Sequence, residues 1–236
     1  MINQGDRKQM SKIDRTLLQE RIQKELTLFK EKHPRSLDMF EKAKAYFLSG
    51  VPMNWMTRWA GKFPVFVKDA RGAHFTDVDG NNYLDFCLGD TGAMAGHAPK
   101  ASVEAICQQA AMGNTFMLPT EDALWVGEEL KKRFRLPYWQ TALTATDANR
   151  FAIRWARQIT QRPKILVFNW CYHGSVDETI ATLQNNEVTA REGNIGPAVD
   201  PAVTTKVVEW NDVAALEAAL QPEDVACVLA EPALTN

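Results

Sequence analysis

Three short apolar runs that alternate with helical patterns restrict the possible folds of this sequence more than any other feature. The runs occupy residues 164–168, 206–209 and 225–230. Between the last two, residues 211–220 have helical periodicity, with Asn211 as the expected N-cap. Strands that are apolar along their whole length are buried on both faces. The pattern therefore predicts an α/β fold in which a mostly parallel sheet is covered by helices on both faces.

The sequence ahead of these runs adds further elements to the same fold. We expect helices at about 99–112, 121–134 and 146–159, and one more strand at 140–143. These elements and the apolar runs together make 96–236 the first part of an α/β domain.

Residues 1–95 are expected to form a separate segment of helices and a β-meander. The expected elements are a helix at 11–32 capped at Ser11, a helix from 36 to about 50 capped at Ser36, and antiparallel strands within 64–86. The strands are expected because apolar and polar residues alternate there between glycine-containing turns.

Charge, hydropathy and cysteine content exclude several classes of function. Lysine and arginine number 27 and aspartate and glutamate 29, so the formal net charge of -2 offers no basic field to a nucleic acid or an anionic membrane. The polar N-terminus is unlike a signal peptide, and no stretch has the roughly 18 to 20 uncharged residues of a membrane span. The four widely spaced cysteines fit a reducing compartment. We expect a cytoplasmic protein with a small-molecule ligand.

Ligands of open α/β sheets bind beyond the carboxyl ends of the strands, and three loops in that position carry polar residues. Thr144, Ala145 and Thr146 open a helix whose first N–H groups could hold a phosphate, although either threonine could simply cap the helix. Tyr172 could stack on a flat cofactor ring or pack in the core. Glu231 could serve a ligand or form a structural salt bridge.

In this order and at these separations, the three loops resemble those of the class III, or fold type I, pyridoxal-phosphate (PLP) aminotransferases. The branch with glutamate-1-semialdehyde aminomutase and β-amino-acid aminotransferases is the most similar. The resemblance covers residues 50–236 through GVPMNWMTRW, DARGAHFTDVDGNNYLDF, GHAP, TATDAN with FAIRWAR, YHG and the terminal EPALTN. It implies the PLP-binding large domain and an enzyme that moves an amino group between an amino acid and a keto acid.

The same resemblance implies where the cofactor phosphate is held. The N–H groups of Ala145 and Thr146, with the hydroxyl of Thr144 or Thr146, would be its donors. The family's Ser-Gly-Thr-Glu is Thr-Ala-Thr-Asp here. If the family's turn requires the left-handed freedom of glycine, alanine strains it by roughly 1 kcal/mol, and we expect binding to survive.

Three further residues take their roles from the resemblance. Tyr172 would stack on the pyridine ring, Glu231 would lie beside the cofactor, and Asn236 would hydrogen-bond the phenolic oxygen of the ring. The family's Schiff-base lysine and its pyridine-pairing aspartate lie further along the chain than Asn236, and no lysine here matches. We therefore expect both from the rest of the polypeptide or from a second chain. A catalytically dead paralogue would lack them as well.

Other functions stay open at this point. Dinucleotide-binding domains also place phosphates at helix N-termini, but no G-x-G-x-x-G or Walker pattern follows any expected strand. A dimerising subunit without catalysis is the alternative within the same fold. Within PLP chemistry, an intramolecular amino shift or a racemisation could replace the transamination.

The loop at 51–58 corresponds to the substrate loop of the family. Arg58, its one strong candidate for binding a substrate carboxylate, could also be a surface charge. Trp55 lies among large apolar residues that could line a pocket for an apolar substrate or seal a dimer interface. Fold type I sites lie between subunits, so the resemblance implies an obligate homodimer or a dimer of split subunits. The apolar faces of the two leading helices agree with a partner surface.

Overall fold

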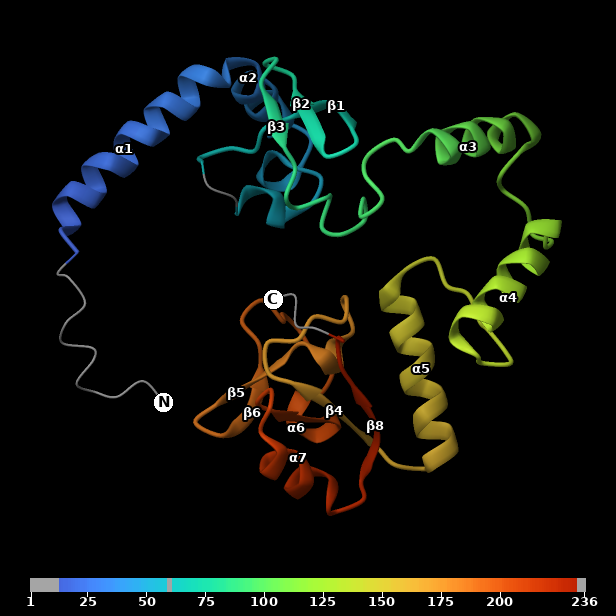
Figure 1. The fold of residues 1–236 in the computed structure, drawn as a ribbon. Coiled ribbons are helices and arrows are strands. Elements are labelled where there is room, and N and C mark those ends of the chain that lie inside the picture. Colours follow the sequence, from blue (N-terminus) through green and yellow to red (C-terminus); the bar gives the residue numbers. More distant parts are fainter. Residues whose placement is uncertain (1–12, 59–60, 233–236) are drawn as a thin grey trace. The chain divides into compact units, whose positions relative to one another are not determined.

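The computed structural model describes residues 13–58 and 61–232, which divide into two compact units between Leu118 and Pro119. Figure 1 shows the elements of both units. The domain boundary expected between 95 and 96 stays a prediction. Within the described ranges, no helix combines the length and the apolar character that a membrane crossing requires.

Unit 1 contains helices and a three-stranded sheet. Its elements are α1 (Arg15–Lys32), α2 (Pro34–Ala43), the 3-10 helices η2 (Leu48–Gly50) and η3 (Asn54–Thr57), β1 (Val67–Arg71), β2 (His74–Asp77), β3 (Asn82–Leu84) and α3 (Lys100–Met112). The three strands pair antiparallel in the order β1-β2-β3, with Phe75 opposite Tyr83. The expected β-meander is therefore confirmed.

The start of α1 agrees only in part with the sequence analysis. The expected cap Ser11 lies outside the described residues. Asp14 is the N-cap, and its side chain accepts hydrogen bonds from the N–H groups of Thr16 and Leu17, each at 3.0 Å. The α1 helix has no fully buried residue within unit 1. The apolar side chains of its first half are exposed there, whereas Phe29 packs against Phe63 in the core of the unit.

The prediction of Ser36 as the cap of the second helix is wrong. Pro34 starts α2 two residues earlier, because proline has a helical φ and needs no acceptor at the first helical position. Ser36 is buried inside the helix instead. The helix also ends at Ala43 rather than near Gly50, because the chain turns back and packs Gly50 against Phe40.

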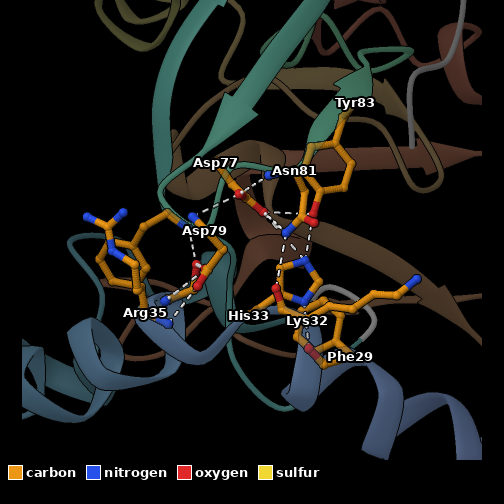
Figure 2. A network of polar contacts seen from close by, with 10 residues as sticks. Phe29, Lys32, His33, Arg35, Asp77, Asp79, Asn81 and Tyr83 are labelled. Atoms are coloured by element: carbon orange, nitrogen blue, oxygen red, sulfur yellow. Dashed lines mark hydrogen bonds and ion pairs between the residues drawn. The ribbon is translucent and has the colours of Figure 1, made fainter.

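A buried carboxylate, Asp77, organises the polar contacts beside the meander (Figure 2). It accepts hydrogen bonds from the N–H groups of Asp79 and Asn81 at 2.9 and 2.8 Å, and from the Asn81 amide at 2.9 Å. The Tyr83 hydroxyl donates to it at 2.8 Å. All of these groups are donors, so the ionised form of Asp77 satisfies the site.

Two side-chain contacts fasten the corner between α1 and α2 to this meander. His33 Nδ1 lies 2.6 Å from the Phe29 carbonyl oxygen, and its Nε2 lies 2.6 Å from the Tyr83 hydroxyl. Asp79 accepts from the N–H groups of Arg35 and Ser36 at 2.6 and 3.0 Å (Figure 2). A carboxylate from the meander thus satisfies donors in the first turn of α2.

Unit 2 contains the α/β part of the chain. Its elements are α4 (Glu121–Phe134), α5 (Ala145–Thr160), β4 (Lys164–Phe168), η4 (Asp177–Thr179), β5 (Ala181–Gln184), β6 (Glu187–Ala190), α6 (Pro201–Thr204), β7 (Thr205–Val208), α7 (Val213–Leu220) and β8 (Val225–Leu229). The sheet order is β7-β4-β8, and both pairings are parallel. This confirms the parallel sheet expected from the apolar runs.

Helices cover both faces of this sheet. On one face, Ile165 and Val167 of β4 pack with Ile153 of α5. On the other face, Leu166 packs in a cluster with Leu216 of α7. Alternate side chains of β4 therefore enter different cores, as the pleat of a strand requires.

Three features of unit 2 differ from the sequence expectations. Residues 140–143 form no strand: Leu143 is fully exposed, and no described strand lies beside them to satisfy their backbone groups. Asp212 rather than Asn211 caps α7, because its side chain accepts from Ala215 N–H at 2.9 Å while Asn211 turns outside the helix at φ +65°. The antiparallel β5–β6 hairpin was not expected.

We expect Asp77→Asn to lower the free energy of unfolding of the full chain by about 2 to 3 kcal/mol. The NH2 group of the new amide would face N–H and O–H donors and could not accept their hydrogen bonds. Urea unfolding measures this change. Asp69→Asn, on the exposed surface of β1, is the matched control and should change stability by less than about 0.5 kcal/mol. Equal losses in the two variants would contradict the role of the buried carboxylate.

Asp77 also predicts part of the acid sensitivity. Burial raises the pKa of Asp77, but hydrogen bonds from Asn81, Tyr83 and Asp79 outweigh it and hold the pKa below its usual value. The group therefore stabilises the fold above its unfolded-state pKa of about 4, and this contribution is lost as the pH falls toward the folded-state pKa. Unfolding free energies measured from about pH 5 downward should fall less steeply in Asp77→Asn than in the wild type.

Candidate functional site

The site lies in unit 2, where the loop 169–175 that follows β4 rests against the first turns of α5. Two hydrogen bonds join the two segments. The N–H of Ser175 donates to Thr146 Oγ1 at 3.2 Å, and the Asn149 amide donates to the carbonyl of His173 at 3.0 Å. Both elements reach the carboxyl edge of the parallel sheet, which is where open α/β folds bind ligands.

Thr144 is the N-cap of α5. Its hydroxyl accepts from the Asp147 N–H at 3.1 Å and donates to the Asp147 carboxylate at 2.8 Å. In this structure the Thr144 hydroxyl therefore caps the helix, which is one of the two roles expected from the sequence. Within the described ranges, no acceptor takes the N–H groups of Ala145 and Thr146. These two backbone donors lie at the positive end of the helix dipole, where an anion is favoured.

Ala145 occupies its position without backbone strain. It is the first residue of α5 and is absent from the residues with positive φ. Left-handed freedom is therefore not needed there, and the alanine in place of the family's glycine costs no strain of that kind.

Gly174 permits the close contact between the loop and the helix. Its φ is +77°, and a Cβ at this position would overlap Thr146 Oγ1 and lie 3.1 Å from Thr146 Cα. Neither the conformation nor the space admits a side chain. The glycine of the YHG motif thus brings the loop onto the first turn of α5.

Asn169 and the β5–β6 hairpin hold the start of the loop. The buried Asn169 amide donates to Glu209 at 2.7 Å, and its oxygen accepts from the Thr182 hydroxyl at 2.8 Å. The next residue, Trp170, has φ +64°, which is unfavourable for a large side chain. Such a conformation persists where surrounding contacts determine it.

Tyr172 projects from unit 2 rather than packing in its core. Tyr172 is 59% exposed, and its backbone N–H donates to Glu231 Oε2 at 3.4 Å. Cys171, directly before it, is buried. The loop therefore anchors one side chain inward and presents the next outward, as a ring that is to contact a ligand requires.

Burial affects the two titratable neighbours of Tyr172. It lowers the pKa of His173, although the charge of Glu231 acts in the opposite direction. It raises the pKa of the Cys171 thiol, with Arg191 opposing and Glu231 reinforcing the shift. Both side chains are therefore held in their neutral forms.

The structure brings together Thr144, Ala145, Thr146, Tyr172 and Glu231. Asn236 lies outside the described residues. The two expected substrate-binding residues belong to unit 1: Trp55 lies in η3 and is 42% exposed, and the N–H of the exposed Arg58 ends η3 by donating to the Trp55 carbonyl at 3.0 Å.

Sequence reasoning missed three residues that hold the loop, namely Asn149, Asn169 and Arg191. Asn149 belongs to the TATDAN motif and could have been found there. Arg191 follows a hairpin that the sequence pattern did not predict, and its Nη2 donates to the Cys171 carbonyl at 2.6 Å. No local sequence pattern predicts that contact.

Comparison with known proteins gives a consistent family. A model described as "Aminotransferase class-III" matches residues 55–236. A glutamate-1-semialdehyde 2,1-aminomutase of Methanocaldococcus jannaschii is 33% identical over 211 residues, which cover 87% of this chain and 49% of that protein. The chain thus spans about half the length of the curated relatives it matches.

Solved structures show the same relationship. A crystal structure of a glutamate-1-semialdehyde-aminomutase from Pseudomonas aeruginosa PAO1 has a TM-score of 0.90 and 49% identity, and the match covers 94% of this chain and 49% of that one. Another structure of an aminomutase from this organism is a complex with PMP. An omega-transaminase from Sphaerobacter thermophilus has a TM-score of 0.74 and 29% identity over 84% of this chain and 47% of its own.

We expect Gly174→Ala to destabilise the full chain by about 2 to 5 kcal/mol, because it adds an overlap with Thr146 to the left-handed backbone penalty. Gly193→Ala is the matched control: Gly193 also has positive φ, +92°, but its Cβ would meet no atom within 4 Å. It should lose only about 1 to 2 kcal/mol. Urea unfolding of both variants compares them, and equal losses would show that the contact with Thr146 is unimportant.

Proposed function

The chain belongs to the class-III aminotransferase family, and we propose that it is the N-terminal portion of a PLP-dependent enzyme that moves an amino group between an amino acid and a keto acid. One observation carries the proposal. At the carboxyl edge of a parallel sheet, two backbone donors of α5 without an acceptor among the described residues lie with the Thr146 hydroxyl against the loop that carries the outward-facing Tyr172. A phosphorylated aromatic cofactor fits this combination of an anion site and a flat apolar surface.

The residues of this chain would bind and orient the cofactor. The N–H groups of Ala145 and Thr146, with the Thr146 hydroxyl, would take its phosphate, while Thr144 caps the helix that aims these donors. Tyr172 would cover one face of the ring. Glu231, which contacts the Tyr172 N–H, would lie beside it. When bound, PLP supplies an electron sink for the carbon that carries the amino group.

Further family residues complete this proposal. Asn236 would hydrogen-bond the phenolic oxygen of the ring. The family's Schiff-base lysine and pyridine-pairing aspartate would come from the rest of the full-length protein or from a second chain. We assign no catalytic residue within this chain, whose contribution is to bind and position.

A second candidate reaction is an amino shift within one substrate. The names of the relatives favour it, since the M. jannaschii protein and the P. aeruginosa structure are both described as glutamate-1-semialdehyde aminomutases. Both reactions need the same cofactor site. Product analysis with the full-length enzyme separates them, because an amino shift consumes no amino acceptor.

We further propose a homodimer in the cytoplasm. In unit 1 the apolar α1 side chains Leu17, Leu18 and Ile22 are at least 40% exposed. Apolar helix faces of this kind are typical of subunit interfaces. All four cysteines are free thiols, which supports a reducing compartment.

We expect Tyr172→Ala in the full-length protein to weaken PLP binding by about 10- to 100-fold, because the ring loses its apolar cover. Tyr172→Phe should stay within about threefold of the wild type. Tyr138→Ala, at an exposed tyrosine of unit 2, is the control and should leave binding unchanged. Equilibrium titration of the apoprotein with PLP measures the dissociation constant, and the absorption spectrum reports the environment of the bound cofactor. Unchanged affinity and spectrum in Tyr172→Ala would contradict the stacking role.

Trp55 provides a test of the substrate site. We propose that it lines a pocket for an apolar or aromatic side chain. Met56 packs into the core of unit 1 with Phe40, whereas Met53 and Trp55 are exposed. Trp55→Ala should then reduce kcat/KM for apolar amino donors by about 10- to 100-fold and leave acidic donors unchanged.

The dimer interface is the competing role of Trp55. Trp125→Ala, at an exposed tryptophan of α4, serves as the control. The dimer dissociation constant should be the same in Trp55→Ala and the wild type. A weaker dimer with an unchanged ranking of donors, or a wild-type preference for acidic donors, would contradict the apolar pocket.

A further inference from the structure

The peptide group between Cys171 and Tyr172 has a charged side chain at each of its ends. Its carbonyl oxygen accepts from Arg191 Nη2 at 2.6 Å, and its N–H donates to Glu231 Oε2 at 3.4 Å. The carbonyl and the N–H of a trans peptide point in opposite directions. A cation and an anion therefore hold one rigid plane from opposite sides, each matched to the polarity of the group it contacts.

We infer that Arg191 is a positioning residue: with Glu231 it clamps the Cys171–Tyr172 peptide and thereby sets the direction in which the Tyr172 ring leaves the loop. The consequence for a ligand rests on the proposed function, because it requires that Tyr172 contact the cofactor. The clamp itself is a property of the loop alone.

Packing anchors Cys171 in this loop but does not hold the two rings beside it. Trp170 and Tyr172 are 58% and 59% exposed, so neither ring is held by burial in unit 2. The left-handed backbone of Trp170 is also costly and needs an external restraint. The Arg191 guanidinium lies over the Trp170 ring, 5.7 Å from its centroid. One side chain thus contacts both the strained residue and the peptide that leads into Tyr172.

Arg191 is itself anchored on a rigid base. It directly follows β6, and its N–H donates to the Ile180 carbonyl at 3.1 Å. Its own carbonyl accepts from the Asn194 N–H at 2.9 Å, and the Asn194 amide donates to Ile180 at 2.9 Å. A half-buried arginine on a fixed backbone loses little further freedom when it holds a carbonyl, and a charged donor makes a strong hydrogen bond.

The electrostatic effects on neighbouring groups agree with this geometry. After burial, which dominates, Arg191 acts to lower the pKa of Cys171 and Glu231 acts to raise it. For His173 the two charges again act in opposite directions. Both charges therefore act on the residues on either side of Tyr172.

A double-mutant cycle in the full-length protein tests the inference. The variants are Arg191→Met, which keeps the stem but removes donors and charge, Arg191→Lys, Tyr172→Ala, and Arg191→Met combined with Tyr172→Ala. Arg154→Met, at an exposed arginine of α5, is the control. Two measurements are made on each: the dissociation constant for pyridoxal 5'-phosphate, and hydrogen exchange of the apoprotein in peptides that cover 169–175.

We expect Arg191→Met to weaken cofactor binding about tenfold and Arg191→Lys to retain most of it. In the Tyr172→Ala background, Arg191→Met should have little further effect, because Arg191 acts through Tyr172. Exchange in 169–175 should become about tenfold faster in Arg191→Met, while peptides from β4 and α5 keep their protection.

Several results would overturn the inference. Additive effects of the two substitutions on cofactor binding would mean that Arg191 contacts the cofactor or acts elsewhere. Unchanged exchange in 169–175 would mean that no clamp exists. Should Arg191→Met fail to fold, Arg191→Gln replaces it with the same expectations. If the wild type does not bind the cofactor, the proposed function fails, and the exchange measurement still decides the clamp.

Discussion

Burial of β4 on both faces is the constraint on which the rest of unit 2 depends. Ile165, Leu166 and Val167 are completely buried, and because they alternate in direction, each face of the sheet requires its own cover. The α5 helix supplies Ile153 to one face, and α7 covers the other. This packing places the N-terminus of α5 at the carboxyl edge, where Thr146 contacts Gly174. The contact holds the loop after β4 against the first turn of α5.

The loop after β4 is then fixed by polar side chains in addition to the buried Cys171. Asn169 donates a hydrogen bond to Glu209. Asn149 donates to the His173 carbonyl, and Arg191 donates to the Cys171 carbonyl. Backbone groups left without partners at such an edge would be costly, so these side chains both satisfy and orient the loop. The Tyr172 ring stays exposed at this edge.

The sequence predicted those features whose cause is local and missed those whose cause is distant. Apolar periodicity located β4, β8 and α5, and alternation with turn residues located the meander, since each pattern reflects burial of its own segment. The Ser36 cap was wrong because Asp79, far along the chain, satisfies the N–H groups of that helix. Arg191 was missed for the same reason. Its partner is a backbone carbonyl in a different loop, and because every residue has such a carbonyl, the sequence does not indicate which one is bound.

The N-termini of α2 and α5 differ in how their first N–H groups are satisfied. At the start of α2, the Asp79 carboxylate takes the N–H groups of Arg35 and Ser36, so that end already holds its anion. At the start of α5, Thr144 and Asp147 satisfy each other, and the N–H groups of Ala145 and Thr146 have no acceptor within the described ranges. The same backbone physics favours a negative charge at both ends. In α2 a carboxylate from another segment takes two of these N–H groups, whereas in α5 the first two N–H groups have no acceptor in the described part of the chain.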